Sequence, residues 1–194
     1  MESIFFKILN FNNYLQINSE AEKFPDREES ARRCALLDAI DTAITDYDVH
    51  VREYEYKQHC KAVAARGLVI TAASGEVVKQ LWDDLFAAGI EEAEKEAVFY
   101  DQFRWHLCSY GKLPALRGSD ADRAFELSPK SSVLVFFQHT DQAFRIENAH
   151  LIRPEDFGAD VPSPYTDVYL FDPVDRWCYI HTHEANCGPY FLES

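Results

Sequence analysis

The chain has 194 residues, which one domain with an appendage can account for, and 47% of them are hydrophobic and 14% aromatic. This supply of apolar side chains is enough for a folded core and excludes an intrinsically disordered chain. The formal net charge of −14 repels phosphate backbones and anionic membranes, so we expect neither a nucleic acid nor a membrane as partner.

A long helix is predicted from about Ser30 to Ala65, after the charged, proline-containing stretch EKFPDREES. The earlier segment IFFKIL fits either an edge strand or a short helix. Within the long helix, apolar residues recur at alternating spacings of three and four, a heptad-like pattern. We call this set the apolar stripe: Leu37, Ile40, Ile44, Tyr47, Val51 and Tyr54.

Carboxylates at helical spacing run beside the apolar stripe, interrupted by Arg52. We call them the acidic ridge: Asp38, Asp41, Asp48 and Glu55. One interpretation is a core-facing helix with an ordinary solvated flank. A second is a surface that binds a basic protein partner, and a third is a homodimer formed through the apolar stripe.

Two further helices are predicted after a break at Gly67. Residues 75–88 show a clear apolar face that includes Trp82, and a glutamate-rich helix follows Gly89. The segment FRWHLCSY, residues 103–110, alternates as a strand does. GSDADRAFELS predicts a short helix capped by Ser119 or Asp120.

The C-terminal third is rich in predicted strands. SSVLVFFQ is apolar on both faces, as a central strand is, and AFRIENAHL is its antiparallel partner. TDVYLF and RWCYIHTHE form a second hairpin around DPVD. With the FRWHLCSY strand, these hairpins predict an α+β fold: a mainly antiparallel sheet of about five strands, helices packed on one face, and a long helix in front.

The cysteines and the N-terminus predict a cytoplasmic protein with free thiols. The five cysteines are irregularly spaced and form neither a CxxC pair nor a disulfide framework. MESIFFKILNFNNYLQ has no basic leader and no small-residue cleavage site. The longest apolar run, residues 133–137, is far too short to span a membrane.

Two segments, VVKQLWDDLFAAGIEEAEKEAVFYDQFRWHLCSYGK and DVYLFDPVDRWCYIHTHEANCGPYF, resemble an uncharacterised bacterial family, domain-of-unknown-function family 4275. The matching positions are Trp82, Phe86, Trp105, His106, Ser109, Tyr110, Trp177, Thr182, His183, Glu184, Gly188, Pro189, Tyr190 and Phe191. The resemblance covers about residues 64–192. It implies a domain at 64–194 behind an acidic helical region at 1–63, and it implies no reaction.

The segment His-Thr-His-Glu, residues 181–184, is the clearest candidate for chemistry. Alternate residues of a strand share a face, so His181 and His183 are predicted to point the same way. With Glu184, Cys187 or His106 as a further ligand, they would bind zinc or another divalent transition metal. Glu184 could instead be a general base beside a metal-bound water.

The competing interpretation is structural: the two histidines end a strand and hydrogen-bond the loop EANCGPYF, while Tyr190 and Phe191 fold back as a hydrophobic plug. No HExxH pair, nucleotide-binding loop or nucleophile elbow is present. We therefore predict a binding protein without a cofactor rather than an enzyme. The predicted function is an acidic module that engages a basic partner, as an inhibitor or immunity-type protein neutralising a toxin does. The alternative is a small metal-dependent hydrolase.

Overall fold

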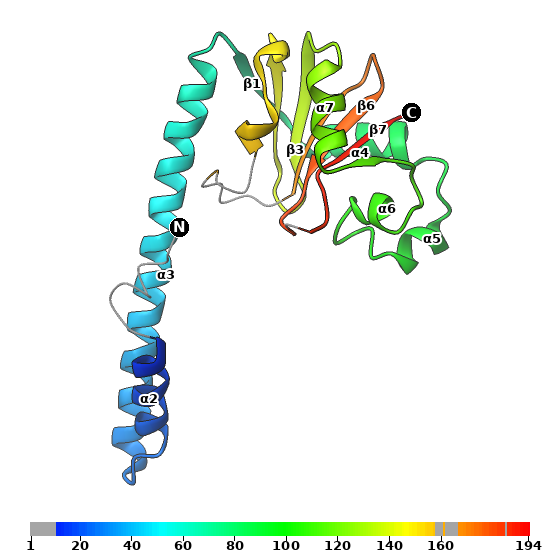
Figure 1. Ribbon diagram of the computed structural model, residues 1–194. Coiled ribbons are helices and arrows are strands. Elements are labelled where there is room, and N and C mark those ends of the chain that lie inside the picture. Colours follow the sequence, from blue (N-terminus) through cyan, green and yellow to red (C-terminus); the bar gives the residue numbers. More distant parts are fainter. Residues whose placement is uncertain (1–10, 158–160, 162–166, 185) are drawn as a thin grey trace. The chain divides into compact units, whose positions relative to one another are not determined.

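The computed structural model describes residues 11–157, 161, 167–184 and 186–194, with side chains described from Gln16 onward (Figure 1). The segment IFFKIL lies outside the described residues. The chain divides into two compact units, Met1–Glu55 and Tyr56–Ser194. Helix α3 (Arg27–Ala64) contributes its last turns to the second unit, and the domain boundary at 63/64 stays a prediction.

The first unit is a helical hairpin, in which α2 (Phe11–Glu22) folds back along α3 (Figure 1). Helix α3 begins after Asp26, whose carboxylate Oδ1 accepts hydrogen bonds from the backbone N–H groups of residues 28 and 29 at 2.9 and 3.1 Å. Such a side chain satisfies donors that the first turn of a helix leaves free. Asp26 is thus the cap, and Ser30 instead donates its hydroxyl to the carbonyl of Ala21.

The second unit is built around one seven-stranded sheet of order β1-β4-β3-β5-β6-β7-β2, in which every neighbouring pair is antiparallel. The α+β class and the two predicted hairpins are confirmed, with seven strands rather than about five. The strands are β1 (Val69–Ser74), β2 (Leu116–Arg117), β3 (Ser132–Phe137), β4 (Gln142–Glu147), β5 (Val168–Asp172), β6 (Trp177–His181) and β7 (Tyr190–Glu193).

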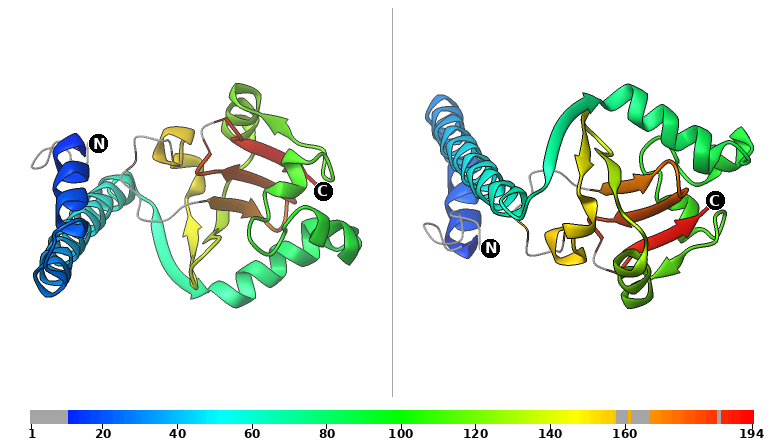
Figure 2. Two further views of the ribbon diagram at one scale, coloured as in Figure 1. Left: turned by 90° about the horizontal axis from the view of Figure 1, so that it is seen from below. Right: turned by 90° about the horizontal axis from the view of Figure 1, so that it is seen from above.

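Helices cover both faces of the sheet rather than the one face predicted (Figure 2). The central strands β3, β5 and β6 are apolar on both sides, so each side needs a cover. One face carries α4 (Gly75–Trp82), its π-helical continuation η1 (Asp83–Ala87), α5 (Glu92–Ala97) and α6 (His106–Ser109). The other carries α7 (Ser119–Leu127), η2 (Ala149–Leu151), η3 (Pro154–Phe157) and the end of α3.

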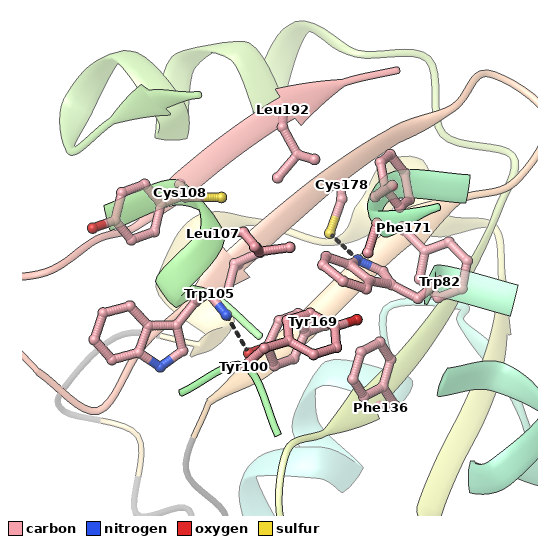
Figure 3. Close-up of a cluster of buried hydrophobic side chains, with 14 of the residues drawn as sticks. Trp82, Tyr100, Trp105, Leu107, Cys108, Phe136, Tyr169, Phe171, Cys178 and Leu192 are labelled. Atoms are coloured by element: carbon pink, nitrogen blue, oxygen red, sulfur yellow. Dashed lines mark hydrogen bonds between the residues drawn. The ribbon is translucent and has the colours of Figure 1, made fainter. Parts of the chain in front are cut away.

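The core beneath α4 and α6 is aromatic and also holds two thiols (Figure 3). The indole N–H of Trp82 donates to Sγ of Cys178 at 3.2 Å, and the backbone N–H of Trp105 donates to the hydroxyl of Tyr169 at 3.0 Å. Burial raises the pKa of the Cys178 thiol, and it raises the pKa of Cys108 to about 12. Both thiols are therefore protonated, inert core groups, because only the thiolate is reactive.

The prediction of a strand at FRWHLCSY is wrong. Residues 106–109 form α6, with the carbonyl of Trp105 accepting from the backbone N–H groups of Cys108 and Ser109. Trp105, Leu107 and Cys108 are all buried, a spacing that fits a helical turn better than alternation. Strand β1, in turn, lies in the segment after Gly67 that was interpreted only as a break.

Helix α7 follows Gly118 without a side-chain cap, so neither Ser119 nor Asp120 has the predicted role. Gly118 has a φ of 58°, a conformation that glycine adopts without strain. Among the described residues, no helix combines the length and apolar character needed to cross a bilayer.

Candidate functional site

The terminal segment, residues 182–184 and 186–194, is held at His183 by Asp167, a carboxylate that the sequence did not single out. Its side chain is fully buried and accepts the backbone N–H of His183 at 2.9 Å. The same carboxylate lies 2.9 and 3.0 Å from Nδ1 of His183. A carboxylate can only accept, so Nδ1 carries the proton and Nε2 is left for other partners. Nε2 lies 3.9 Å from the carboxylate of Glu184.

Aromatic rings surround the imidazole of His183. The ring of Phe103 lies 5.2 Å from His183, 5.1 Å from His106 and 5.3 Å from His139, measured between centroids. Trp105 lies 6.1 Å from His183 on the same side. Since Trp105 belongs to the core beneath α4 and α6, His183 faces this side of the sheet.

His181 faces the other side of the sheet. It ends β6, and by strand alternation it shares a face with Tyr179, which packs in the core beneath α7. Burial lowers the pKa of His181, opposed by the negative charge of Asp122 on α7. The prediction that His181 and His183 point the same way is therefore wrong, because the strand ends before His183.

Two of the other predicted metal ligands, Glu184 and Cys187, lie close together after β6, whereas His106 lies on α6. The hydroxyl of Thr182 donates to the backbone carbonyls of Glu184 and Cys187. The backbone N–H of Cys187 donates to the backbone carbonyl of Glu184 at 2.9 Å. A hydrogen bond to the Glu184 carboxylate raises the pKa of the Cys187 thiol, which disfavours the thiolate that a metal needs. In the part of the chain that the structure describes, no group of three or more His, Cys, Asp or Glu side chains is placed to hold a metal ion.

The predicted plug is a strand. Tyr190 and Phe191 begin β7, which pairs with β6 on one side and with β2 on the other. Both side chains are buried, and they lie in the cores on opposite faces of the sheet. The terminal segment thus completes the sheet, while Asp167 fixes the turn that leads into it.

The acidic ridge lies on a part of α3 that packs no described side chain into a hydrophobic core. Asp38 and Asp41 are exposed, whereas Asp48 and Glu55 are half-buried. One carboxylate oxygen of Glu55 is buried without a hydrogen-bond partner among the described residues. No described side chain of α3 is buried along its 38 residues. Within the apolar stripe, Ile40, Tyr47 and Tyr54 are 47%, 52% and 60% exposed. The other three residues are half-buried: Leu37, Ile44 and Val51.

An ion-pair cluster that sequence reasoning missed joins η1 to the segment before α6. The guanidinium of Arg104 donates to both carboxylate oxygens of Asp83, at 2.8 and 3.0 Å, and Tyr100 donates its hydroxyl to the same group. Burial, together with this contact to Asp83, raises the pKa of Tyr100. Bidentate geometry fixes orientation as well as charge. No local pattern in the sequence marks these three residues as neighbours.

An antiparallel sheet between two helical layers makes this an α+β protein, and the contact between Asp167 and His183 fixes the turn after β6. The chain belongs to the family described as domain of unknown function (DUF4275), whose model matches residues 61–191. The predicted resemblance is confirmed. The match contains strands β1 to β6 and the first two residues of β7, and most of α3 precedes it. Comparison with curated proteins and with solved structures found no match.

Proposed function

We propose that this chain is a protein-binding module that engages a basic protein partner through α3, as inhibitors and immunity-type proteins do. The observation that carries this proposal is the exposure of Ile40, Tyr47 and Tyr54, half of the apolar stripe, on a helix without a described buried side chain. Most helices in proteins are stabilised by packing of an amphipathic face. Contiguous exposed apolar residues on a soluble protein mark an interaction site.

The charge beside the stripe indicates the sign of the partner. The acidic ridge places carboxylates along the border of the apolar stripe, where a partner's rim residues would meet them. Lysine or arginine side chains at those positions would pair with the carboxylates and accelerate encounter. The net charge of −14 adds a long-range attraction for a basic surface.

A second copy of the chain fits the stripe less well. When the stripe is written as heptad positions a and d, Asp41, Asp48 and Glu55 occupy position e. In an antiparallel pair these carboxylates would face the same carboxylates of the other copy and repel them. In a parallel pair they would face Leu36, Ala43 and His50, which offer no permanent positive charge.

The test is a pair of matched charge reversals on α3. Asp38→Lys with Asp41→Lys changes the ridge, and Asp46→Lys with Glu53→Lys makes the same change in charge elsewhere on the helix, at exposed positions. Full-length wild type and both variants are used for quantitative affinity capture from lysate of the source cells. We expect a basic protein whose capture falls about tenfold for the ridge variant and stays unchanged for the control. Equal capture by all three chains would refute the proposal.

The oligomeric state distinguishes binding of a basic partner from a homodimer formed through the apolar stripe. We expect the purified chain to be a monomer in size-exclusion chromatography with light scattering. A stable dimer that Tyr47→Asp converts to a monomer would assign the apolar stripe to self-association instead.

The metal-dependent hydrolase stays the alternative, and one observation favours it. Asp167 holds Nδ1 of His183 and leaves Nε2 available, which is how metal-binding imidazoles are commonly oriented. Elemental analysis after zinc loading and dialysis tests it, with His183→Ala compared with His150→Ala, a change at an exposed histidine. Near-stoichiometric zinc that only the first variant loses would favour the hydrolase. A metal-free wild type would remove it.

A further inference from the structure

The two edges of the sheet differ in how they are protected. Strand β2 has two residues, one of which is Arg117, and short charged edges resist pairing with other chains. Strand β1 has six residues, VITAAS, without a charge or a proline, and β4 is its partner strand (Figure 2). Val69 and Ile70 are 50% and 41% exposed. An apolar edge of this length is a template for a further strand.

The outer side of β1 presents backbone groups that suit an extended chain. In an antiparallel pair, alternate residues direct their N–H and C=O groups at the partner strand and the others direct them away from it. Every residue of β1 has a partner position on β4, so the outward groups alternate regularly along its length. In the described residues no other strand pairs with these groups.

An apolar cavity of about 170 Å³ adjoins this edge. It is lined on the sheet side by Ile70, Val135, Phe144 and Ile146, and on the other side by Val63 and Phe157. Because Ile70 belongs to both the edge strand and the lining, the cavity reaches the position where an added strand would place its side chains. An apolar cavity of about 150 Å³ is large enough for a benzene ring.

The polar groups near the cavity hold its wall together. His59 Nε2 lies 3.0 Å from the carbonyl oxygen of Asp156, and Arg66 forms an ion pair with the Asp156 carboxylate at 2.6 Å. These contacts tie the last turns of α3 to η3 across the cavity. The lining of the cavity is mainly apolar. His59, Arg66 and Asp156, which could bind a polar ligand, are already paired with each other.

A second copy of the chain does not fill this site. In a two-fold antiparallel pairing of β1 with itself, residues that face each other must lie on the same face of the sheet. The registers that pair most of the strand then place Ala72 or Ser74 opposite Ile70. Neither is large enough to enter the cavity, and the net charge of −14 on each copy opposes the pairing.

We propose that β1 binds an extended segment of another protein by strand addition, and that one Leu, Ile or Phe side chain of this segment enters the cavity. Backbone hydrogen bonds would supply affinity, and the cavity would supply specificity, as in other peptide-binding sheets. Basic residues flanking the apolar anchor suit the charge of the chain. This site lies in the second unit and does not depend on the acidic ridge.

The probes are peptides selected from a random twelve-residue library displayed on mRNA, with the full-length chain as target. Selected peptides are synthesised, their affinities are measured by fluorescence anisotropy, and amide protection is measured by NMR hydrogen exchange. We expect alternating apolar sequences with a bulky anchor, and new protection of alternate amides in β1. Replacing the anchor by alanine is expected to weaken binding about tenfold or more.

N-methylation of the peptide backbone tests strand pairing without altering the protein. A strand bound along one edge uses alternate N–H groups, so methylating one alternate set should abolish binding and methylating the other should preserve it. Val69→Lys should weaken binding, while Val174→Lys, in the turn after β5 and 84% exposed, should not. Asp38→Lys with Asp41→Lys should leave the peptide affinity within about twofold.

Several outcomes would overturn the proposal. An equal effect of the two methylated sets would show that the peptide does not bind along one edge. Protection confined to amides outside β1, or a selection that enriches no peptide over a Val69→Lys counter-target, would place binding elsewhere. Protection of β1 that grows with protein concentration in the absence of peptide would assign the edge to a second copy.

Discussion

The helical hairpin and the sheet unit contain the same types of apolar residue but bury them to very different extents. Among the described residues of the hairpin, Ala21 alone is buried, whereas Trp82, Phe136 and Tyr169 of the sheet unit are 0% exposed. Apolar residues recur at helical spacings in both α3 and α4, but the apolar side is far more sharply separated from the polar side in α4. Such a pattern predicts that a helix has one apolar side, but it does not say whether the covering surface belongs to the same chain.

The largest expected difference between the two units is in the cost of losing an aromatic ring. Phe136 is fully buried and stacks on Tyr169 at 4.5 Å, so Phe136→Ala should lower the free energy of unfolding by about 3–5 kcal/mol. Tyr47, 52% exposed on α3, should change it by less than about 0.5 kcal/mol when replaced by alanine. Urea unfolding measures both when it is followed by tryptophan fluorescence for the sheet unit, which holds all three tryptophans, and by far-UV circular dichroism for the helices of the hairpin.

That comparison fails if the two variants unfold alike. A large loss for Tyr47→Ala would mean that the apolar stripe is covered in the free chain. The protein-binding proposal would then lose the observation that carries it.

A smaller effect is expected at Asp167, which the sheet unit uses to close its last turn. Asp167→Ala leaves the N–H of His183 without its buried acceptor and should cost about 2–3 kcal/mol. The φ of Asp167 is 55°, a conformation that asparagine tolerates better than alanine does. Asp167→Asn keeps an acceptor and should cost about 1 kcal/mol. Urea unfolding gives the costs, and imidazole NMR shows whether His183 keeps its Nδ1 proton. An unchanged tautomer in the alanine variant would contradict this assignment.

The sequence could predict the parts of the fold that rest on local patterns. The two C-terminal hairpins follow from strand-length apolar runs separated by turn residues, and the long helix follows from its periodicity. The prediction of a strand at FRWHLCSY was wrong because alternation over so short a segment also fits a helical turn. The VITAAS segment that forms β1 has small side chains and lies between two helices, so its pattern was weak.

The contact between Asp167 and His183 could not be predicted, for a different reason. Asp167 precedes β5 and His183 follows β6, and the register that pairs Val168 with His181 brings the two ends together. The prediction about His181 and His183 failed for a related reason, because alternation is informative only as far as the strand continues. The acidic ridge and the apolar stripe lie on the predicted helix, and whether they bind a partner stays a prediction.

The hairpin depends on local contacts more than the sheet unit does, and its cap should show this. Asp26→Ala removes the acceptor for two backbone N–H groups and should destabilise the start of α3 by about 1 kcal/mol. Amide exchange in the first turns of α3 should become faster, while exchange in β3 and β5 stays unchanged. Asp46→Ala, in the middle of the same helix, is the matched control. Faster exchange throughout the sheet would show that the units unfold together.

The smallest expected effect is a pH dependence of the stability of the sheet unit, which comes from His181. Burial lowers the pKa of His181 below its ordinary value of 6.5, so the folded chain keeps this ring neutral at pH values where the unfolded chain binds a proton. Stability should therefore be highest above pH 6.5, fall as the pH drops through 6.5, and stop falling from this cause below the folded pKa. His181→Gln should remove an uptake of less than one proton on unfolding, seen as a flatter plot of unfolding free energy against pH. His150→Gln, at an exposed position, should leave the plot unchanged. Parallel plots for wild type and His181→Gln would mean that the ring is solvated, and the sheet unit would then hold no pH-sensitive group at the end of β6.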